Sequence, residues 1–161
     1  IFAPYLAGER NPGWQGTARG YMAGIGLHHR APHFVRAAME GIAYQIAWVY
    51  ECVAETAGEP QGIRITGGFV RSRVWPQILA DVLGRELEVP SSNEGSLLGS
   101  ALFGFAAVEP SLNWRELARQ VPVVARIEPD AGRHRRYREI FATYKELYGA
   151  VRPLFDAIAS L

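Results

Sequence analysis

Residues 62–84 read Gly-Ile-Arg-Ile-Thr-Gly-Gly-Phe-Val-Arg-Ser-Arg-Val-Trp-Pro-Gln-Ile-Leu-Ala-Asp-Val-Leu-Gly. β-Branched and polar side chains alternate from Ile63 to Thr66, and the run then stops at two glycines, which predicts a short strand that ends in a tight bend. Apolar pairs recur every four residues after the bend and predict a helix that ends at Gly84. Ser72 is the expected N-cap of this helix.

A strand, a glycine bend and a helix start can together hold a nucleotide. Glycines let a ligand approach the backbone, and the free amides of a first helical turn attract anions or polar ring edges. Paired glycines in such turns also serve simply to reach a positive φ, and on spacing alone this structural interpretation is favoured. Gly67 and Gly68 are therefore candidate site residues that need support from the rest of the chain.

The composition is that of one soluble globular domain. The chain has 161 residues, and its hydrophobic fraction of 48% and charged fraction of 20% are enough for a core. A formal charge of +1 argues against nucleic acid or an anionic membrane surface as a partner. There is no signal peptide and no apolar run of about 18 residues, so no spanning helix is expected. The single cysteine, Cys52, is interpreted as a buried thiol in a reducing compartment, which indicates the cytoplasm.

The first thirty residues lack a strong helical pattern. Residues 1–6 read like the interior of a longer protein, so we expect the chain to be a fragment of a larger polypeptide. Residues 1–17 are rich in glycine and proline and predict an ordered loop, in which Glu9 and Arg10 pair with each other or, alternatively, reach a ligand. Residues 18–27 predict a strand closely approached by another backbone. His28, His29 and His33 are interpreted as loop residues, because no cysteine or carboxylate completes a metal site at a recognisable spacing.

A long helix is predicted over residues 33–57. Its apolar residues extend around much of its circumference, so we expect it to be covered on more than one side, and self-association through this surface remains open. Glu40 is the one charge inside the apolar stripe and needs a partner. We favour a role for Glu40 in capping a neighbouring loop, and the alternative is a position at a cleft.

The pattern after Gly84 repeats the strand and helix. Residues 85–89 predict a strand that ends at Pro90, and residues 96–108 predict a helix lying close against a sheet. The expected buried face of this helix consists of Leu97, Leu98, Ala101, Leu102 and Phe105. Strand, helix, strand and helix in this order imply a parallel crossover and an α/β core.

The last third of the chain predicts a short helix, a connection and a long helix. Asn113 and Glu116 resemble a capping box for a helix to about Gln120. Residues 121–127 contain a proline and are interpreted as an extended connection rather than a central strand. The last helix begins near Asp130, and Pro153 should kink or break it. Four arginines cluster near its start and are interpreted as a solvated face, with a phosphate site as the alternative: Arg133, Arg135, Arg136 and Arg138.

Three segments, in order, carry a resemblance to a known family. The first matches the second sequence pattern of the FGGY family of carbohydrate kinases at every defined position, through Gly20, Met22, Gly24, Ile25, His33, Phe34, Ala37, Ala38, Met39 and Glu40. The second resembles the adenosine segment of that family, through Gly67, Gly68, Phe69, Val70, Arg71, Ser72, Trp75, Gln77, Ala80 and Asp81. Residues 94–101 resemble the helix that typically follows. Nearly the whole chain is therefore similar to the carboxy-terminal domain of this family.

The resemblance implies a fold and a reaction. The fold would be α/β, a ribonuclease-H-like domain of the actin-like ATPase superfamily, helix-rich and partial, with residues 1–161 as one domain that lacks the amino-terminal sugar-binding domain. The whole protein would transfer the γ-phosphoryl group of ATP to a sugar hydroxyl. Residues 4–10, 27–29 and 67–72 are most similar to the members that act on gluconate and next to those that act on xylulose, so the 6-hydroxyl of D-gluconate is the expected acceptor.

The same resemblance implies roles for four residues. Gly67 and Gly68 would let the backbone pass close to the α-phosphate and ribose of the nucleotide, and Phe69 would lie beside it. Ser72 occupies the position where relatives often have an asparagine that touches adenine, and serine is shorter with fewer hydrogen-bonding groups. Gln77 and Asp81, on the helix that follows, are expected to hold the fold and not to touch a ligand.

The catalytic groups are expected outside this chain. Phosphoryl transfer needs a carboxylate at the sugar hydroxyl, a Mg²⁺ site and a hairpin that grips the phosphates. In the family these groups would precede Ile1, and Asp81, Asp130 and Asp156 match none of them. The chain would supply the adenosine-side wall of a cleft and would be inactive alone. ATP and Mg²⁺ are the expected cofactors of the whole protein, and its expected partners are a small sugar or sugar acid and its own amino-terminal domain.

Two further classes of function remain open. The first is a nucleotide-binding module of the same superfold without transferase activity, which the sequence upstream of Ile1 would distinguish. The second is a helical interaction domain without a ligand, which would be favoured if the structure had no opening beside Gly67 and Gly68.

Overall fold

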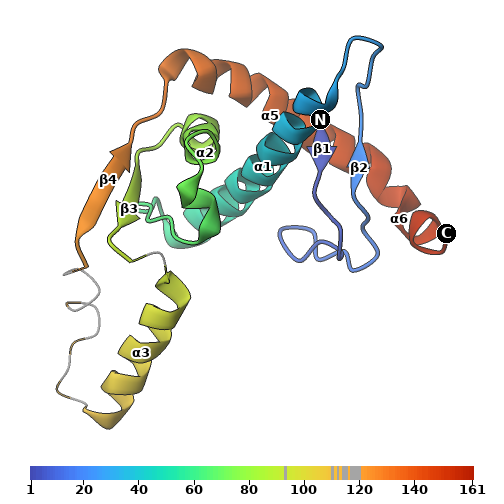
Figure 1. Ribbon diagram of the computed structural model, residues 1–161. Helices are drawn as coiled ribbons and strands as arrows, with labels where there is room; N and C mark the ends of the chain where they lie inside the picture. The colour runs from blue at the N-terminus through green and yellow to red at the C-terminus, as the bar shows by residue number, and fades with distance from the viewer. Residues whose placement is uncertain (93, 110, 112, 114–115, 117–120) are drawn as a thin grey trace.

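The computed structural model of the chain describes residues 1–92, 94–109, 111, 113, 116 and 121–161. Figure 1 shows its elements, which in chain order are β1 (Phe2–Ala3), β2 (Tyr21–Met22), α1 (Ala31–Ala57), the 3-10 helix η1 (Gly68–Arg71), α2 (Trp75–Leu83), β3 (Leu87–Pro90), α3 (Gly95–Val108), β4 (Val123–Ile127), α5 (Ala131–Val151), the 3-10 helix η2 (Arg152–Leu154) and α6 (Phe155–Ala159).

Three helices, α1, α2 and α5, form the body of the molecule. The short helix α2 packs against both long ones, and its pattern of apolar pairs places Ile78, Leu79 and Val82 in the core. Helix α1 contributes Tyr44, which is 1% exposed and stacks on Phe141 of α5 with 6.1 Å between ring centroids. Burial of aromatic rings on this scale is the main favourable term of such a core.

The predicted helices have nearly the predicted ends. Helix α1 begins two residues before the predicted start at residue 33, so that His33 lies in its first turn and not in a loop. Gly84 ends α2 in the left-handed conformation, with φ of 65°, as the C-cap pattern predicts. Asp130 caps α5 by accepting a hydrogen bond of 2.7 Å from the Arg133 amide, and η2 interrupts the helix at Pro153 as predicted.

The strands differ more from prediction. The predicted strand over 18–27 is reduced to β2, which pairs antiparallel with β1 inside the predicted N-terminal loop. The predicted strand over 63–66 is reduced to one bridge, from Arg64 to Glu88 of β3. This bridge is parallel, as the predicted parallel crossover requires. The segment over 121–127 was interpreted as a connection, but its residues from Val123 on form β4, which pairs antiparallel with β3. Pro122 stands just before β4, where its missing N–H costs no ladder hydrogen bond.

The N-terminal loop is fastened to the core by buried polar groups. Tyr5 and Tyr144 have hydroxyl oxygens 2.8 Å apart, and both lie within hydrogen-bond distance of the side-chain oxygen of Gln45. Burial raises the pKa of Tyr144, and of Tyr5 beside it, so both phenols stay protonated and can donate. The loop therefore has a fixed position against α1 and α5.

The predicted pairing of Glu9 with Arg10 is wrong. Glu9 is only 3% exposed, and its carboxylate accepts hydrogen bonds from the Gly13 amide, the Gln15 amide and the Tyr148 hydroxyl, at 3.1, 3.4 and 3.2 Å. A buried carboxylate requires such donors, and the backbone of its own loop provides two of them. Glu9 thus holds the loop closed.

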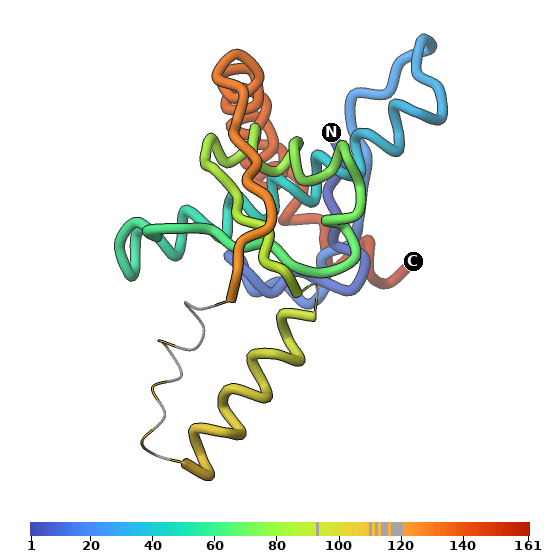
Figure 2. Tube along the Cα trace, turned by 60° about the vertical axis from the view of Figure 1, so that its left-hand side comes forward, coloured from blue at the N-terminus to red at the C-terminus, as the bar shows by residue number. Residues whose placement is uncertain are grey.

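Helix α3 forms as predicted but does not pack as predicted. It contributes no buried residue, and the two views in Figures 1 and 2 both show it projecting away from the three-helix body. Leu97 is 69% exposed and Phe105 is 62% exposed, although both were assigned to a buried face. The start of α3 lies close to the segment before the glycine bend: a Cβ atom on Gly95 would be 2.5 Å from the Thr66 hydroxyl oxygen.

Three smaller predictions have different outcomes. Cys52 is half-buried and not enclosed. The short helix predicted from Asn113 to Gln120 falls largely outside the described residues. Over the part of the chain that the structure describes, none of the helices has the length and apolar character needed to cross a membrane.

Candidate functional site

The glycine bend joins the Arg64 bridge to η1. The amide of Ile65 donates to the Glu88 carbonyl at 2.9 Å, which fixes the end of the strand segment beside β3. Gly67 follows with φ of 101° and ψ of 179°, a conformation that strains any L side chain. Its carbonyl accepts from the Val70 amide at 3.3 Å and begins the 3-10 turn. The bend therefore requires glycine at position 67 for backbone reasons alone.

Gly68 is different, because its backbone does not require glycine. No positive φ is found at Gly68, and a Cβ atom added there would meet no other heavy atom within 4 Å, as is also true at Gly67. The backbone of both residues thus faces open space. No packed side chain of the described residues covers the two glycines at these positions.

Phe69 and Ser72 lie on either side of this turn. The Phe69 ring meets the Trp75 ring edge to face with 5.7 Å between centroids, so Phe69 helps to fix η1 on α2. The Ser72 hydroxyl accepts from the Val74 and Trp75 amides at 3.3 and 3.2 Å. Ser72 thus caps the backbone amides just before and at the first residue of α2, Trp75, in line with its predicted capping role. That hydroxyl keeps its own proton available for a further acceptor.

A shallow apolar hollow of about 190 Å³ lies next to the bend. It is lined by Arg64 and Thr66 from the strand segment, by Pro90, Ser92 and Val121 near β3 and β4, and by Gly95, Leu98, Gly99 and Leu102 from α3. Glycines at two positions on α3 leave room between the helix and the strand segment. The start of α3 thus forms a second wall beside the bend.

Asp81 is a structural residue, as the sequence indicated. Its side chain is 2% exposed, and it accepts from the Gln77 amide group, the Asp130 backbone amide and the Arg133 guanidinium at 2.9, 2.8 and 2.6 Å. The bonds from Asp130 and Arg133 join α2 to the start of α5, and the bond from Gln77 lies within α2. The prediction that Gln77 and Asp81 hold the fold is consistent with this geometry. Arg133 is exposed, as predicted for a solvated face, and it also pairs with Asp81.

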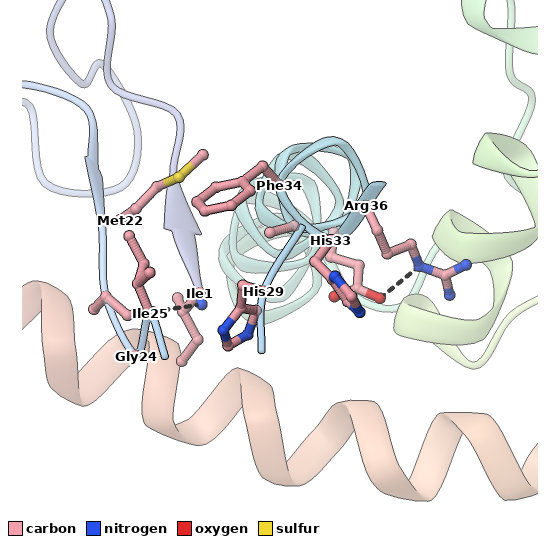
Figure 3. A pocket seen from close by; sticks show the side chains of 11 residues that line it. Ile1, Met22, Gly24, Ile25, His29, His33, Phe34 and Arg36 are labelled. Carbon is pink, nitrogen blue, oxygen red and sulfur yellow. Dashed lines mark hydrogen bonds and ion pairs between the residues drawn. The ribbon is translucent and has the colours of Figure 1, made fainter. Parts of the chain in front are cut away.

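A second hollow, of about 240 Å³, opens at the start of α1 (Figure 3). One side is apolar, with Ile1, Met22, Ile25 and Phe34, and the other side carries His33, Arg36 and Glu40. The favoured role of Glu40 as a loop cap is wrong and the cleft alternative is right. Its carboxylate accepts from Arg36 at 2.7 Å and from the Tyr137 hydroxyl at 2.9 Å, at the edge of this hollow.

The histidines of this region are bound to backbone. His33 accepts from the Arg30 amide at 3.0 Å, and His29 accepts from the Gly26 amide at 2.9 Å. Within the described residues, no group of three or more His, Cys, Asp and Glu side chains is placed to hold a metal ion. The described residues therefore offer no donor set for a Mg²⁺ site, and no chemical step is assigned to one.

The comparisons with known proteins place these features in a family. Residues 1–108 match the FGGY family of carbohydrate kinases, C-terminal domain. The chain belongs to this family, and its fold is the helix-rich, partial carboxy-terminal domain that the sequence predicted, with the actin-like ATPase architecture.

Similarity to individual members extends over the whole chain. It is 33% identical over 161 residues to a gluconokinase of Bacillus licheniformis and 34% identical over 154 residues to a xylulose kinase of Escherichia coli. Among solved structures, it superposes with a TM-score of 0.86 on a ligand-bound xylulose kinase and with 0.84 on a gluconate kinase, both from Lactobacillus acidophilus and both 25% identical. These structures are matched over 98% of this chain. The chain spans 31% of the length of the gluconokinase and 32% of the two structures.

Proposed function

We propose that the protein carrying this chain phosphorylates a sugar or sugar acid with ATP, and that D-gluconate is its acceptor. Membership of the FGGY family supports the reaction class. Gluconokinases and xylulose kinases match with similar identity, so xylulose is the second candidate acceptor. The activity belongs to the cytoplasm in this proposal.

The glycine bend supports the part assigned to this chain. Its backbone at Gly67 and Gly68 is open, and the Ser72 hydroxyl proton lies four residues further on. The adjacent apolar hollow offers a surface on which a flat purine ring can lie. In our proposal Gly67, Gly68, Phe69 and Ser72 form the adenosine-side wall of the cleft, where ATP approaches bare backbone. The observation that carries this assignment is the open space over the two glycines.

The catalytic groups are proposed to come from outside the chain. Asp81 is buried and fully engaged, and Asp130 accepts from the Arg133 amide at the start of α5, so neither carboxylate is free to deprotonate a sugar hydroxyl. When bound, Mg²⁺ would neutralise the phosphate charge, and residues beyond this chain would hold it. The exposed apolar side chains of α3 are then a natural contact for the protein's amino-terminal part.

Activity assays test the proposal. The protein with its amino-terminal part, supplied with ATP and Mg²⁺, should convert gluconate to a phosphate ester and form one ADP per ester. The 161-residue chain alone should form none. Turnover of xylulose but not of gluconate would overturn the substrate assignment, and a full-length protein that binds ATP without transferring phosphate to any sugar would favour a non-catalytic nucleotide-binding module.

A further inference from the structure

Three arginines converge on a hollow that the proposed nucleotide wall does not use. The hollow, of about 210 Å³, lies where α1, α2 and α5 meet, and it shares no lining residue with the glycine bend or with the hollow beside α3. Its lining consists of Arg36 from α1, Arg73, Val74, Gln77, Ile78 and Asp81 in and before α2, and Arg133 from α5. We call it the arginine hollow.

Two of the arginines are held in place by partners. Arg36 donates through Nε to Glu40 at 2.7 Å and through one terminal nitrogen to the Tyr137 hydroxyl at 2.6 Å. Figure 3 shows this side chain pointing away from the apolar side of the α1 hollow and toward the green ribbon of α2. Arg133 donates through Nε to Asp81 at 2.6 Å. Each guanidinium has five donors, so both keep N–H groups for a ligand at a small further cost in side-chain entropy.

The third arginine has no partner within the described part of the chain. Arg73 is exposed, and among the residues that the structure describes it makes no hydrogen bond or ion pair. It follows Ser72 directly, so the capping bonds of Ser72 fix the backbone from which it projects. An unpaired guanidinium beside two oriented ones is suited to an incoming anion.

The charge of the lining is strongly local. The hollow is lined by three positive side chains and one negative side chain, whereas the whole chain has a net charge of only +1. The single carboxylate, Asp81, is 2% exposed and already accepts three hydrogen bonds, so it presents little negative charge to a ligand. Glu40 lies outside the lining but pairs with Arg36, so the attraction for an anion comes chiefly from Arg73 and from the N–H groups that Arg36 and Arg133 do not use.

We propose that the arginine hollow binds the dianion of a phosphate group, either free phosphate or a small phosphate monoester. Guanidinium forks match phosphate oxygens in pairs, and a tetrahedral dianion offers several pairs of oxygens to arginines that approach from α1, from the segment before α2 and from α5. A carboxylate has only two oxygens and cannot engage three forks in this way. The volume is several times the roughly 30 Å³ of one water, enough for a phosphate group and part of its ester. The proposal does not rest on the kinase reaction.

Calorimetric titration of the protein carrying this chain tests the site, with inorganic phosphate, methyl phosphate and acetate as probes. Inorganic phosphate should bind at millimolar or lower concentration and acetate should not. Arg73→Glu should weaken phosphate binding about tenfold or more, because it replaces an attraction by a repulsion. Arg73 is exposed and makes no hydrogen bond or ion pair among the described residues, so this variant should keep the melting temperature of the wild type.

Arg135→Glu is the matched control, because Arg135 is an exposed arginine of α5 outside the hollow and the change in total charge is the same. Phosphate affinity should change less than twofold in this variant. Binding of methyl phosphate like that of phosphate would identify a monoester as a ligand, and binding of phosphate alone would restrict the site to the free ion; both support the proposal. Absence of phosphate binding, or equal losses in Arg73→Glu and Arg135→Glu, would overturn it.

Discussion

Helices α2 and α3 come from similar sequence patterns but have opposite surroundings. Both follow a strand segment, and both carry apolar residues at helical spacing. Ile78 and Leu79 of α2 are 2% and 3% exposed, whereas Leu97 and Val108 of α3 are 69% and 85% exposed. Among the residues that the structure describes, α2 has a cover and α3 has none.

The difference shows what an amphipathic pattern encodes. Spacing of apolar residues determines that a helix forms and which side chains share a face, but the cover comes from other parts of a chain. Helix α2 is covered because α1 and α5 lie on it and because Asp81 is bonded to the first turn of α5. The glycine bend owes its fixed geometry to this covered helix, which makes α2 the support of the proposed nucleotide wall.

The largest contrast is expected from a matched pair of leucine truncations. Leu79→Ala should lower the free energy of unfolding of the chain by about 3 kcal/mol, because it leaves a cavity in the core. Leu97→Ala should change it by less than about 0.5 kcal/mol, since Leu97 is mostly in water. Urea unfolding followed by circular dichroism measures both. In the protein with its amino-terminal part, a larger loss for Leu97→Ala would show that α3 is covered there, and similar losses in the isolated chain would contradict the comparison.

An intermediate effect is expected at the junction of α2 and α5. Asp81→Ala removes the acceptor of three hydrogen bonds and leaves the Asp130 amide and Arg133 without a partner. We expect the free energy of unfolding to fall by about 2 kcal/mol. This is less than for a fully buried ion pair that loses one partner, because Arg133 is 53% exposed. Glu139→Ala, which breaks the exposed pair with Arg136, is the control and should cost little. An equal decrease in the free energy of unfolding for both variants would show that the bonds of Asp81 do not stabilise the packing of α2 on α5.

The smallest effect concerns the start of α5 and depends on pH. The pKa of Asp130 is lowered, chiefly because its carboxylate accepts from the Arg133 amide. A carboxyl group with a lower pKa in the folded state stabilises the fold above its unfolded pKa, and this contribution is lost as the pH falls through the folded pKa. The difference in melting temperature between the wild type and Asp130→Ala should therefore be present at neutral pH and shrink in acid, below the ordinary range of aspartate. A difference independent of pH would contradict the capping role.

Local features of this fold could be predicted from the sequence. Ser72 and Gly84 at the two ends of α2, Asp130 at the start of α5 and the break at Pro153 follow from rules that involve only neighbouring residues. The opening over Gly67 and Gly68 was inferred from the same local chemistry.

Long-range pairings could not be predicted in this way. Glu9 with Tyr148 and Arg133 with Asp81 are separated by 139 and 52 residues, and no local pattern indicates either partner. Glu40 shows the same limit: its need for a partner was visible, but Arg36 and Tyr137 became apparent only when α1 and α5 were placed together. The arginine hollow was missed because its arginines belong to three separate segments.

The affinity for ATP of a Gly68→Val variant tests the central claim most directly. Position 68 has room for a side chain and no need of glycine for its backbone, so the variant should melt like the wild type, as should the matched control Gly62→Val, which also adds atoms in open space. If the bend receives the adenosine end of ATP, Gly68→Val should weaken ATP binding by the protein with its amino-terminal part about tenfold or more, and Gly62→Val should leave it unchanged. Wild-type ATP affinity in Gly68→Val would contradict the claim.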